Sequence, residues 1–331
     1  MSSTSSDAMW IDRTGWSWIQ MHGADRVDLL NRLSTNDLTA LATGQGLQTV
    51  LITDKARIID VLMVLNDVER SMVLASPNMA PRIIRWLRTY TITDDVRTTD
   101  ASSLMEMVEV TGARAAEVVK AVTSVEVTLF TIGEWIATSI SEQEVYVFRM
   151  SPTVELSYWM VGNPAAIGVI KERLQEIDGL EKPLAQDDVE YLRVMQGIGV
   201  MGHEWSEAYN PLEAGLLHLT SFTKGCYVGQ EIIARLDSYN KVKQRVLGFV
   251  SDNEIHVADS ILVDNATVGA ITTVAKGRST NKWYALGYIR GEHAHPGASV
   301  DVRTNQTKDV DAQASNNSAL AEIMLLPMVE Q

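Results

Sequence analysis

The chain has 331 residues, of which 46% are hydrophobic and 21% charged, and this length and composition predict roughly two or three packed domains. Its formal net charge of −14 excludes non-specific binding of nucleic acids or anionic membranes through the bulk surface, because such binding needs clustered Lys and Arg. The single cysteine, Cys226, excludes an intrachain disulfide and a self-sufficient iron–sulfur cluster, which usually needs about four thiolates.

The N-terminal residues and the apolar runs predict a cytoplasmic protein without membrane association. Residues 1–9 contain no Lys or Arg, so they resemble neither a signal peptide nor a transit peptide. Apolar runs such as Val61–Leu65 are far shorter than the ~20 residues that cross a bilayer.

The first half of the chain mixes strand and helix patterns. Residues 16–21 are strand-like, a helical spacing of apolar residues follows Asp25, and strands at 47–53 and 57–65 flank a turn. Further on, we expect helices at about 80–89, 113–122 and 165–177, between strands at 72–75, 107–110 and within 127–161. Antiparallel sheets backed by helices fit this order better than a doubly wound sheet.

Glycines at 197, 199 and 202 have the spacing of a dinucleotide-binding fingerprint, which needs a strand before it and a helix after it. The preceding residues 187–196 are helical in pattern instead, so Gly197 is predicted to cap a helix C-terminus. The stretch Asn210–Glu213 fits the start of another helix, with Asn210 as its N-cap.

After residue 240 short β-like runs alternate with Gly, Asn and Asp, which predicts a compact module of roughly 85 residues, either a small barrel or a sandwich. His293 and His295 lack a third ligand at metal-site spacing. No metal site is therefore predicted.

The stretch Thr-Lys-Gly-Cys-Tyr-Val-Gly-Gln-Glu, residues 223–231, contains the only cysteine. Gly225 and Gly229 permit sharp turns on either side of it, and good helix formers follow from Gln230. The thiol is thus predicted just before a helix N-terminus, where Lys224 would favour the thiolate. Burial of Cys226 as a small hydrophobe is the alternative.

A cationic island is predicted around the cysteine. It sets five basic residues against Glu231 and Asp237: Lys224, Arg235, Lys241, Lys243 and Arg245. Such an island suits an acidic ligand or partner, although a solvated linker explains it equally well.

The stretch at 224–235, Lys-Gly-Cys-Tyr-Val-Gly-Gln-Glu-Ile-Ile-Ala-Arg, resembles the signature of the YgfZ-type folate-binding proteins. These proteins belong to the glycine cleavage T-protein (aminomethyltransferase) superfamily and are implicated in maintaining iron–sulfur enzymes. The similarity extends over most of the chain and includes Leu-Asn-Arg-Leu-Ser-Thr-Asn-Asp-Leu at 30–38, Gly-Gln-Gly at 44–46 and Asn-Pro-Leu-Glu-Ala-Gly-Leu at 210–216.

This resemblance implies an α+β, three-part T-protein-like fold, with antiparallel sheets backed by helices and a C-terminal small β-barrel. Residues 1–240 would form the folate-cleft region from two interleaved α+β subdomains, and residues 241–331 the barrel module. Cys226 would be the reactive or partner-facing thiol, in a loop shaped by Lys224, Gly225, Tyr227, Gly229, Gln230, Glu231 and Arg235. Tetrahydrofolate would be the cofactor, at a site with Asn36, Arg193, Tyr227 and the position of Met195.

The first departure from the family pattern is Met195. Relatives commonly have Leu-Arg-Ile-Glu-Ala-Gly where this chain has Leu192–Gly197, and their Glu accepts hydrogen bonds from the pterin. A thioether is a weak acceptor, so two ligand donors would lose their partner. The expected cost is on the order of 2 to 4 kcal/mol, or ~30- to 1000-fold in affinity.

The second departure is at Asp60. T-proteins carry paired Asp residues in this strand, one of which supports attack by the folate nitrogen, whereas here Val61 follows Asp60. Neighbouring strand residues face opposite ways, so neither position can substitute for the other. Asp60 is predicted as a catalytic residue of the cleft or, alternatively, as a solvent-facing strand residue.

These features lead to three hypotheses. The first is a YgfZ-like protein that supports iron–sulfur cluster assembly or repair through Cys226, with iron–sulfur enzymes or assembly proteins as partners. The second is an enzyme, a tetrahydrofolate-dependent aminomethyl or methyl transferase. The third is a non-enzymatic binding protein that has lost folate and binds a partner at the cationic island.

Overall fold

The computed structural model describes residues 8–150, 156–238, 242–304 and 318–329. The chain divides into two compact units. The first contains Met1–Lys55, Ile59–Ala185 and Leu219–Gln230, and the second contains Ala56–Ile58, Gln186–His218 and Glu231–Gln331. The segment 186–218 therefore belongs to the same unit as the barrel, and a domain boundary at 240 remains a prediction. No helix in the described ranges is long and apolar enough to cross a membrane.

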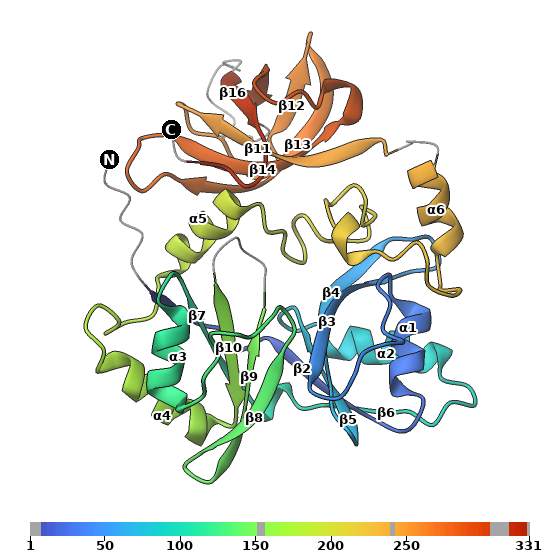
Figure 1. The fold of residues 1–331 in the computed structure, drawn as a ribbon. Helices are drawn as coiled ribbons and strands as arrows, with labels where there is room; N and C mark the ends of the chain where they lie inside the picture. The colour runs from blue at the N-terminus through green and yellow to red at the C-terminus, as the bar shows by residue number, and fades with distance from the viewer. Residues whose placement is uncertain (1–7, 151–155, 239–241, 305–317, 330–331) are drawn as a thin grey trace, which may run out of the picture. The chain divides into compact units, whose positions relative to one another are not determined.

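The first unit contains two five-stranded sheets (Figure 1). One has the strand order β1 (Met9–Asp12), β7 (Glu106–Thr111), β10 (Ser157–Gly162), β9 (Gln143–Arg149), β8 (Trp135–Ile140). The other has the order β3 (Gln45–Ile52), β4 (Ile58–Asn66), β5 (Arg70–Ala75), β2 (Ser17–His22), β6 (Arg97–Asp100). Pairing is antiparallel in both, as where Trp18 of β2 lies opposite Leu74 of β5.

Helices cover the outer faces of the two sheets. Helices α3 (Ala115–Thr123) and α4 (Pro164–Gln175) pack on the first sheet, and α1 (Arg26–Leu33) and α2 (Ala80–Tyr90) on the second (Figure 1). A shared apolar cluster packs one sheet against the other and includes Trp18, Met63, Leu74, Met107, Phe148 and Trp159. The predicted antiparallel α+β arrangement is confirmed, and the three helices predicted in this half lie within two residues of their observed ends.

The second unit contains a closed six-stranded barrel rather than a sandwich. Its order is β11 (Gln244–Ser251), β14 (Trp283–Arg290), β13 (Ala266–Lys276), β12 (Ser260–Val263), β15 (Ser299–Arg303), β16 (Ser318–Met324). Register shifts in β13, opposite both of its neighbours, supply the bends that closure of a small barrel requires. Phe249, Ile261 and Ile271 are among the residues that fill its core.

The segment before the barrel begins with α5 (Gln186–Gln196) and includes a 3₁₀ turn at Leu217–Leu219, before α6 (Gln230–Ser238). Gly197 ends α5 as predicted, with φ of 74° and the two backbone bonds of a Schellman motif, Gly197 N to Val194 O and Ile198 N to Arg193 O. A helix precedes the glycines and turns follow them, so the context of a dinucleotide fingerprint is lacking in this described stretch. The helix predicted from Asn210 is wrong: its capping bonds with Glu213 form, but they close a turn.

Candidate functional site

The loop that carries Cys226 spans residues 219–230 and exposes the thiol-bearing side chain. This observation decides against the alternative of a buried cysteine. Helix α6 begins at Gln230, four positions after Cys226, so the predicted helix is present. Gln230 bonds back to the loop, where the amide of Tyr227 donates to Gln230 Oε1 at 3.4 Å. Glu231 and Arg235 are exposed on α6.

The two glycines that flank Cys226 have different roles. Gly229 has a φ of 80°, which supports the predicted sharp turn. Gly225 has no positive φ, and a Cβ atom built on it would meet nothing within 4 Å. The chain does bend at Gly225, as predicted, but this bend does not require a glycine, and the small size of the residue leaves the space next to Cys226 open.

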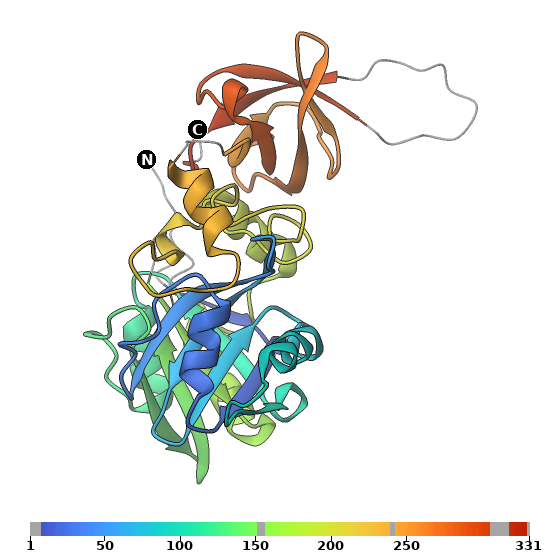
Figure 2. The same cartoon turned by 90° about the vertical axis from the view of Figure 1, so that its right-hand side faces the viewer.

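The loop lies beside α1 and the residues that follow this helix (Figure 2). The amide of Val228 donates to the carbonyl oxygen of Arg32 at 2.9 Å, and the amide of Ser221 donates to that of Thr35, also at 2.9 Å. The Thr35 hydroxyl donates to the carbonyl oxygen of Leu219 at 2.6 Å. The fold thus brings together the motif at 30–38 and the cysteine motif, which are almost two hundred residues apart in sequence.

Lys224 is buried, and its ammonium group binds oxygen atoms at the end of α1. Burial lowers the Lys224 pKa to about 8, against the opposing effect of the nearby Asp37 carboxylate. The ammonium is thus occupied inside the first unit, so Lys224 is not part of a surface island as predicted. The predicted island loses this member, and Lys241 lies outside the described residues.

Asn36 and Tyr227, both predicted as cofactor-binding residues, lie close to Lys224. Asn36 accepts a hydrogen bond from Lys224 through its carbonyl oxygen at 2.6 Å, while its side-chain Nδ2 donates to the carbonyl oxygen of Gln48 at 2.8 Å. The Tyr227 ring centroid is 4.6 Å from the Lys224 Nζ, a distance suited to a cation–π interaction. Burial raises the pKa of Tyr227 to about 12, so its hydroxyl stays protonated at neutral pH.

Asp60 is fully buried in β4, so the alternative of a solvent-facing residue is wrong. Its Oδ1 accepts from the amide of Val61 at 2.8 Å and the hydroxyl of Ser76 at 2.7 Å, and its Oδ2 accepts from the amide of Ser76 at 2.9 Å. Burial raises its pKa to about 6, although these hydrogen bonds oppose the shift. The contacts connect β4 to the turn that precedes α2.

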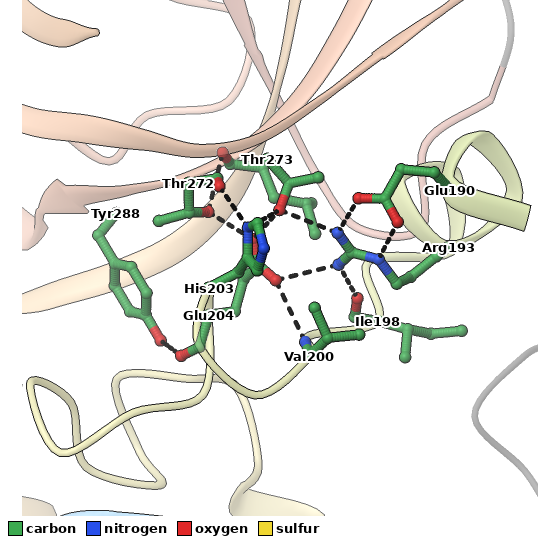
Figure 3. Close-up of polar contacts among 10 residues, drawn as sticks. Glu190, Arg193, Ile198, Val200, His203, Glu204, Thr272, Thr273 and Tyr288 are labelled. Carbon is green, nitrogen blue, oxygen red and sulfur yellow. Dashed lines mark hydrogen bonds and ion pairs between the residues drawn. The ribbon is translucent and has the colours of Figure 1, made fainter. Parts of the chain in front are cut away.

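Arg193, the third predicted cofactor-binding residue, lies within a polar network of the second unit (Figure 3). Its Nε and Nη2 both donate to the Glu190 carboxylate. Its Nη1 donates to the carbonyl oxygen of Ile198 at 2.6 Å and to Glu204 Oε2 at 3.0 Å, and Nη2 also donates to the Thr273 hydroxyl at 2.9 Å. Since a guanidinium has five N–H donors, all of them are used within the protein.

Glu204 is the buried centre of this network. Its carboxylate also accepts from the hydroxyls of Thr272 and Thr273 in β13 and from the amide of Val200 at 3.2 Å. Charged groups are buried at low cost only when they are paired and hydrogen-bonded, as here. The network joins α5 and the turn after it to the barrel.

Met195 is buried in an apolar cluster of the second unit. The cluster also contains Tyr191, Val194, Ala275, Tyr284, Leu286 and Met328. The amide of Met328 donates to the carbonyl oxygen of Met195 at 2.6 Å, so the segment after β16 packs on the end of α5. Met195 thus occupies an environment suited to a thioether and costly for an ionised carboxylate.

Three residues with central roles were missed by the sequence analysis. Thr35 lies in the motif at 30–38, so the signal was present but its partner was unknown. Ser76 is hydrogen-bonded to Asp60, 16 positions away, and Glu204 to Arg193, 11 positions away. The fold, rather than any local pattern, creates their contacts.

Within the ranges described, no three His, Cys, Asp or Glu side chains gather to hold a metal ion. Asn36 and Arg193, which were predicted to bind folate, already use side-chain N–H donors in hydrogen bonds within the protein. The exposed nucleophile of this region is the Cys226 thiol.

Comparisons with known proteins agree on one family. A family model described as the GCVT N-terminal domain matches residues 1–224, and one described as the glycine cleavage T-protein C-terminal barrel domain matches residues 244–318. A protein of Arabidopsis thaliana that is named as a chloroplastic transferase is 28% identical over 302 residues, which cover 88% of this chain and 67% of that protein. The aminomethyltransferase of Halothermothrix orenii is 23% identical over 320 residues, covering 94% of this chain and 85% of the relative.

The fold is similar to the crystal structure of the glycine cleavage system aminomethyltransferase T from Bartonella henselae. The TM-score is 0.83 at 18% sequence identity, and the match covers 98% of this chain and 87% of the other. With its two helix-covered antiparallel sheets and its C-terminal barrel, the chain belongs to the glycine cleavage T-protein family.

Proposed function

We propose that this chain is a YgfZ-type member of the family that supports the assembly or repair of iron–sulfur enzymes through Cys226. The observation that carries the proposal is an exposed thiol between two buried side chains, those of Lys224 and Tyr227. A free cysteine is usually buried, so a fixed loop that presents one favours reaction or contact with a partner. Phe222, exposed in the same loop, adds apolar surface for that contact.

The surroundings of Asp60 argue against one-carbon transfer as the main activity. A carboxylate that assists the folate nitrogen must reach the reacting atoms. Asp60 is fully buried and accepts three hydrogen bonds from Val61 and Ser76. We therefore infer that its role here is structural.

The surroundings of Met195 argue against tight folate binding at this position. An apolar cluster that includes Met328 and Tyr284 encloses Met195, which is only 7% exposed. Arg193 has no N–H group left for a ligand, because the protein uses all five. We expect tetrahydrofolate to bind far more weakly than in a relative that keeps the Glu.

A second candidate function is tetrahydrofolate-dependent aminomethyl or methyl transfer. It is favoured by the relatives named aminomethyltransferases, which match over most of this chain. It predicts that purified protein forms methylenetetrahydrofolate or methyltetrahydrofolate from an amine or thioether donor. The third candidate, a binding protein without folate, predicts that neither this product nor folate binding is found and that a partner binds at the cationic island.

The proposal is tested in a strain that lacks the protein by expressing variants at equal levels and measuring the activity of an iron–sulfur enzyme. We expect Cys226→Ala and Cys226→Ser to restore less than about a tenth of the activity that the unmodified chain restores. Thr223→Ser, which removes one methyl group from an exposed side chain of the same loop, is the control and should restore most of it. Full restoration by Cys226→Ala would refute the role of the thiol.

Calorimetric titration of tetrahydrofolate and of its 5-formyl derivative separates the folate-dependent candidates. We expect no micromolar binding to the unmodified protein. Met195→Glu tests whether a restored carboxylate recovers affinity, and Met195→Gln, whose side chain has the shape of Glu without its charge, is the comparison. Thermal unfolding of each variant reports whether the cluster around residue 195 tolerates the change. Micromolar binding by the unmodified chain would favour the transferase.

A further inference from the structure

Lys224 spans the gap between the cysteine loop and the end of α1 with a single side chain. Its Nζ donates to the carbonyl oxygens of Asn31 at 2.6 Å, Ser34 at 2.7 Å and Asn36 at 2.6 Å, and lies 3.2 Å from Asn31 Oδ1. An ammonium group has three N–H donors, so these oxygens use all of them. The side chain is only 7% exposed.

The binding partners of this ammonium are groups that a helix end leaves unsatisfied. The last four carbonyl groups of a helix lack an intrahelical partner and carry the negative end of the helix dipole. Asn31 lies in the last turn of α1, and Ser34 is its C-cap. Lys224 therefore caps α1 from a segment 190 positions away in sequence.

The position of Lys224 in the loop fixes the residues around Cys226. Lys224 is anchored two residues before the cysteine, and the amide of Val228, two residues after it, donates to the carbonyl oxygen of Arg32. Tyr227 is buried against the Lys224 ammonium. Cys226 lies between these anchors with its side chain exposed.

We propose that Lys224 is a positioning residue that holds Cys226 outward by binding the carbonyl oxygens at the end of α1. The inference rests on the proposed function of Cys226, because only then does a fixed thiol matter. It assigns to the lysine of the cysteine motif an architectural role that needs N–H donors as well as positive charge. The surface charge of the loop plays no part in it.

The test compares three variants by amide hydrogen exchange of residues 219–230 and by the second-order rate of Cys226 with N-ethylmaleimide. Lys224→Met keeps an unbranched side chain that is only one atom shorter and removes the donors. Lys224→Ala removes the last four atoms of the lysine side chain and leaves a space in their place. Lys182→Met, at an exposed lysine of the same unit, is the control for the loss of charge.

We expect exchange of the loop amides to rise at least tenfold in Lys224→Met and Lys224→Ala, with the Lys182→Met protein like the unmodified one. Propylammonium, which replaces the four lost atoms, should return exchange and thiol reactivity of Lys224→Ala toward the original values. Tetramethylammonium, a cation without N–H groups, should not. Unchanged exchange and thiol reactivity in Lys224→Met, or equal rescue by both cations, would overturn the proposal.

The same variants in the complementation assay distinguish this inference from the function on which it rests. If Cys226→Ser is inactive and Lys224→Met is fully active with an unchanged loop, the positioning role is wrong and the proposed function stands. If Cys226→Ser is active while Lys224→Met loosens the loop, the proposed function is wrong and the anchor stands. If Cys226→Ser and Lys224→Met are both inactive, and only Lys224→Met has a loosened loop, the result supports the positioning role and the proposed function together.

Discussion

The hydroxyl of Thr35 donates a hydrogen bond to the carbonyl oxygen of Leu219 at 2.6 Å, across 184 positions of the sequence. The hydroxyl oxygen of Thr35 also accepts a hydrogen bond from the amide of Val50 in β3 at 3.2 Å. One buried side chain therefore joins the start of the cysteine loop to the residues after α1 and to the neighbouring sheet. This relationship explains how the loop keeps its place without a disulfide.

Thr35→Val removes this hydroxyl while preserving the shape of the side chain. It leaves the Leu219 carbonyl and the Val50 amide without this partner, and we expect the free energy of unfolding to fall by about 2 kcal/mol. Urea unfolding followed by tryptophan fluorescence measures the change. Thr35→Ser, which keeps the hydroxyl, should lose less than half as much, and equal losses in the two variants would show that the hydrogen bonds are not the cause.

Replacing the two glycines of the loop by alanine should affect stability differently. Gly229→Ala places a side chain at a φ of 80°, and we expect it to destabilise the loop by about 1 kcal/mol. Gly225→Ala meets no atom within 4 Å and should leave the melting temperature unchanged.

If a partner approaches Cys226 through the open space at Gly225, Gly225→Ala should still lower the restored iron–sulfur enzyme activity several-fold. Thermal unfolding and the complementation assay on the same two variants provide the comparison. A stable Gly225→Ala variant with full activity would mean that the partner approaches from elsewhere.

The elements of the fold were predictable from the sequence where one local pattern dominated. Apolar periodicity found α2, α3 and α4, and the Gly197 cap followed from the change of pattern after α5. Asp60 was ambiguous, because alternation suggests an exposed face only when one side of a sheet meets solvent. All nine residues of β4 are buried, so this strand shows no alternation.

The position of Lys224 was not predictable from the sequence. A lysine beside a cysteine suggests a surface charge, and only the docking of the loop on α1 reveals carbonyl oxygens that bury it. The same holds for Glu204, whose partners come from α5 and β13. Contacts between distant segments arise from the topology, which the spacing of residues does not encode.

Asp60 should make the stability of the protein depend on pH in a recognisable way. Burial raises its pKa from 3.8 to about 6, so the folded chain binds this proton more tightly than the unfolded chain. Its contribution to stability is thus fully present below pH 3.8 and is lost as the pH rises through 6. Between pH ~4.5 and ~7.5 the loss should be about 2 kcal/mol.

Urea unfolding of the unmodified protein and of Asp60→Asn at these two pH values isolates the contribution of Asp60 to the free energy of unfolding, because the other titrating groups are common to both proteins. We expect the unmodified protein to gain about 2 kcal/mol relative to the variant at the lower pH. A difference that is independent of pH would show that Asp60 has an ordinary pKa.

The buried pair of Arg193 and Glu204 should behave as one unit. Arg193→Met leaves two carboxylates without their cation, Glu190 and the buried Glu204, and we expect a loss of about 3 to 5 kcal/mol. Adding Glu204→Gln removes the buried unpaired charge and should recover part of that loss. A double-mutant cycle in thermal unfolding measures the coupling, and strictly additive losses would contradict the network.

The most direct test of the account uses the unmodified chain, because Cys226 is its only cysteine. N-ethylmaleimide then blocks this thiol alone, and the treated protein is added to an extract that lacks the native copy and contains an oxidatively damaged iron–sulfur enzyme. We predict that untreated protein speeds recovery of the enzyme's activity and that blocked protein has no effect beyond that of buffer. Equal recovery with blocked and untreated protein would contradict the claim that the function depends on Cys226.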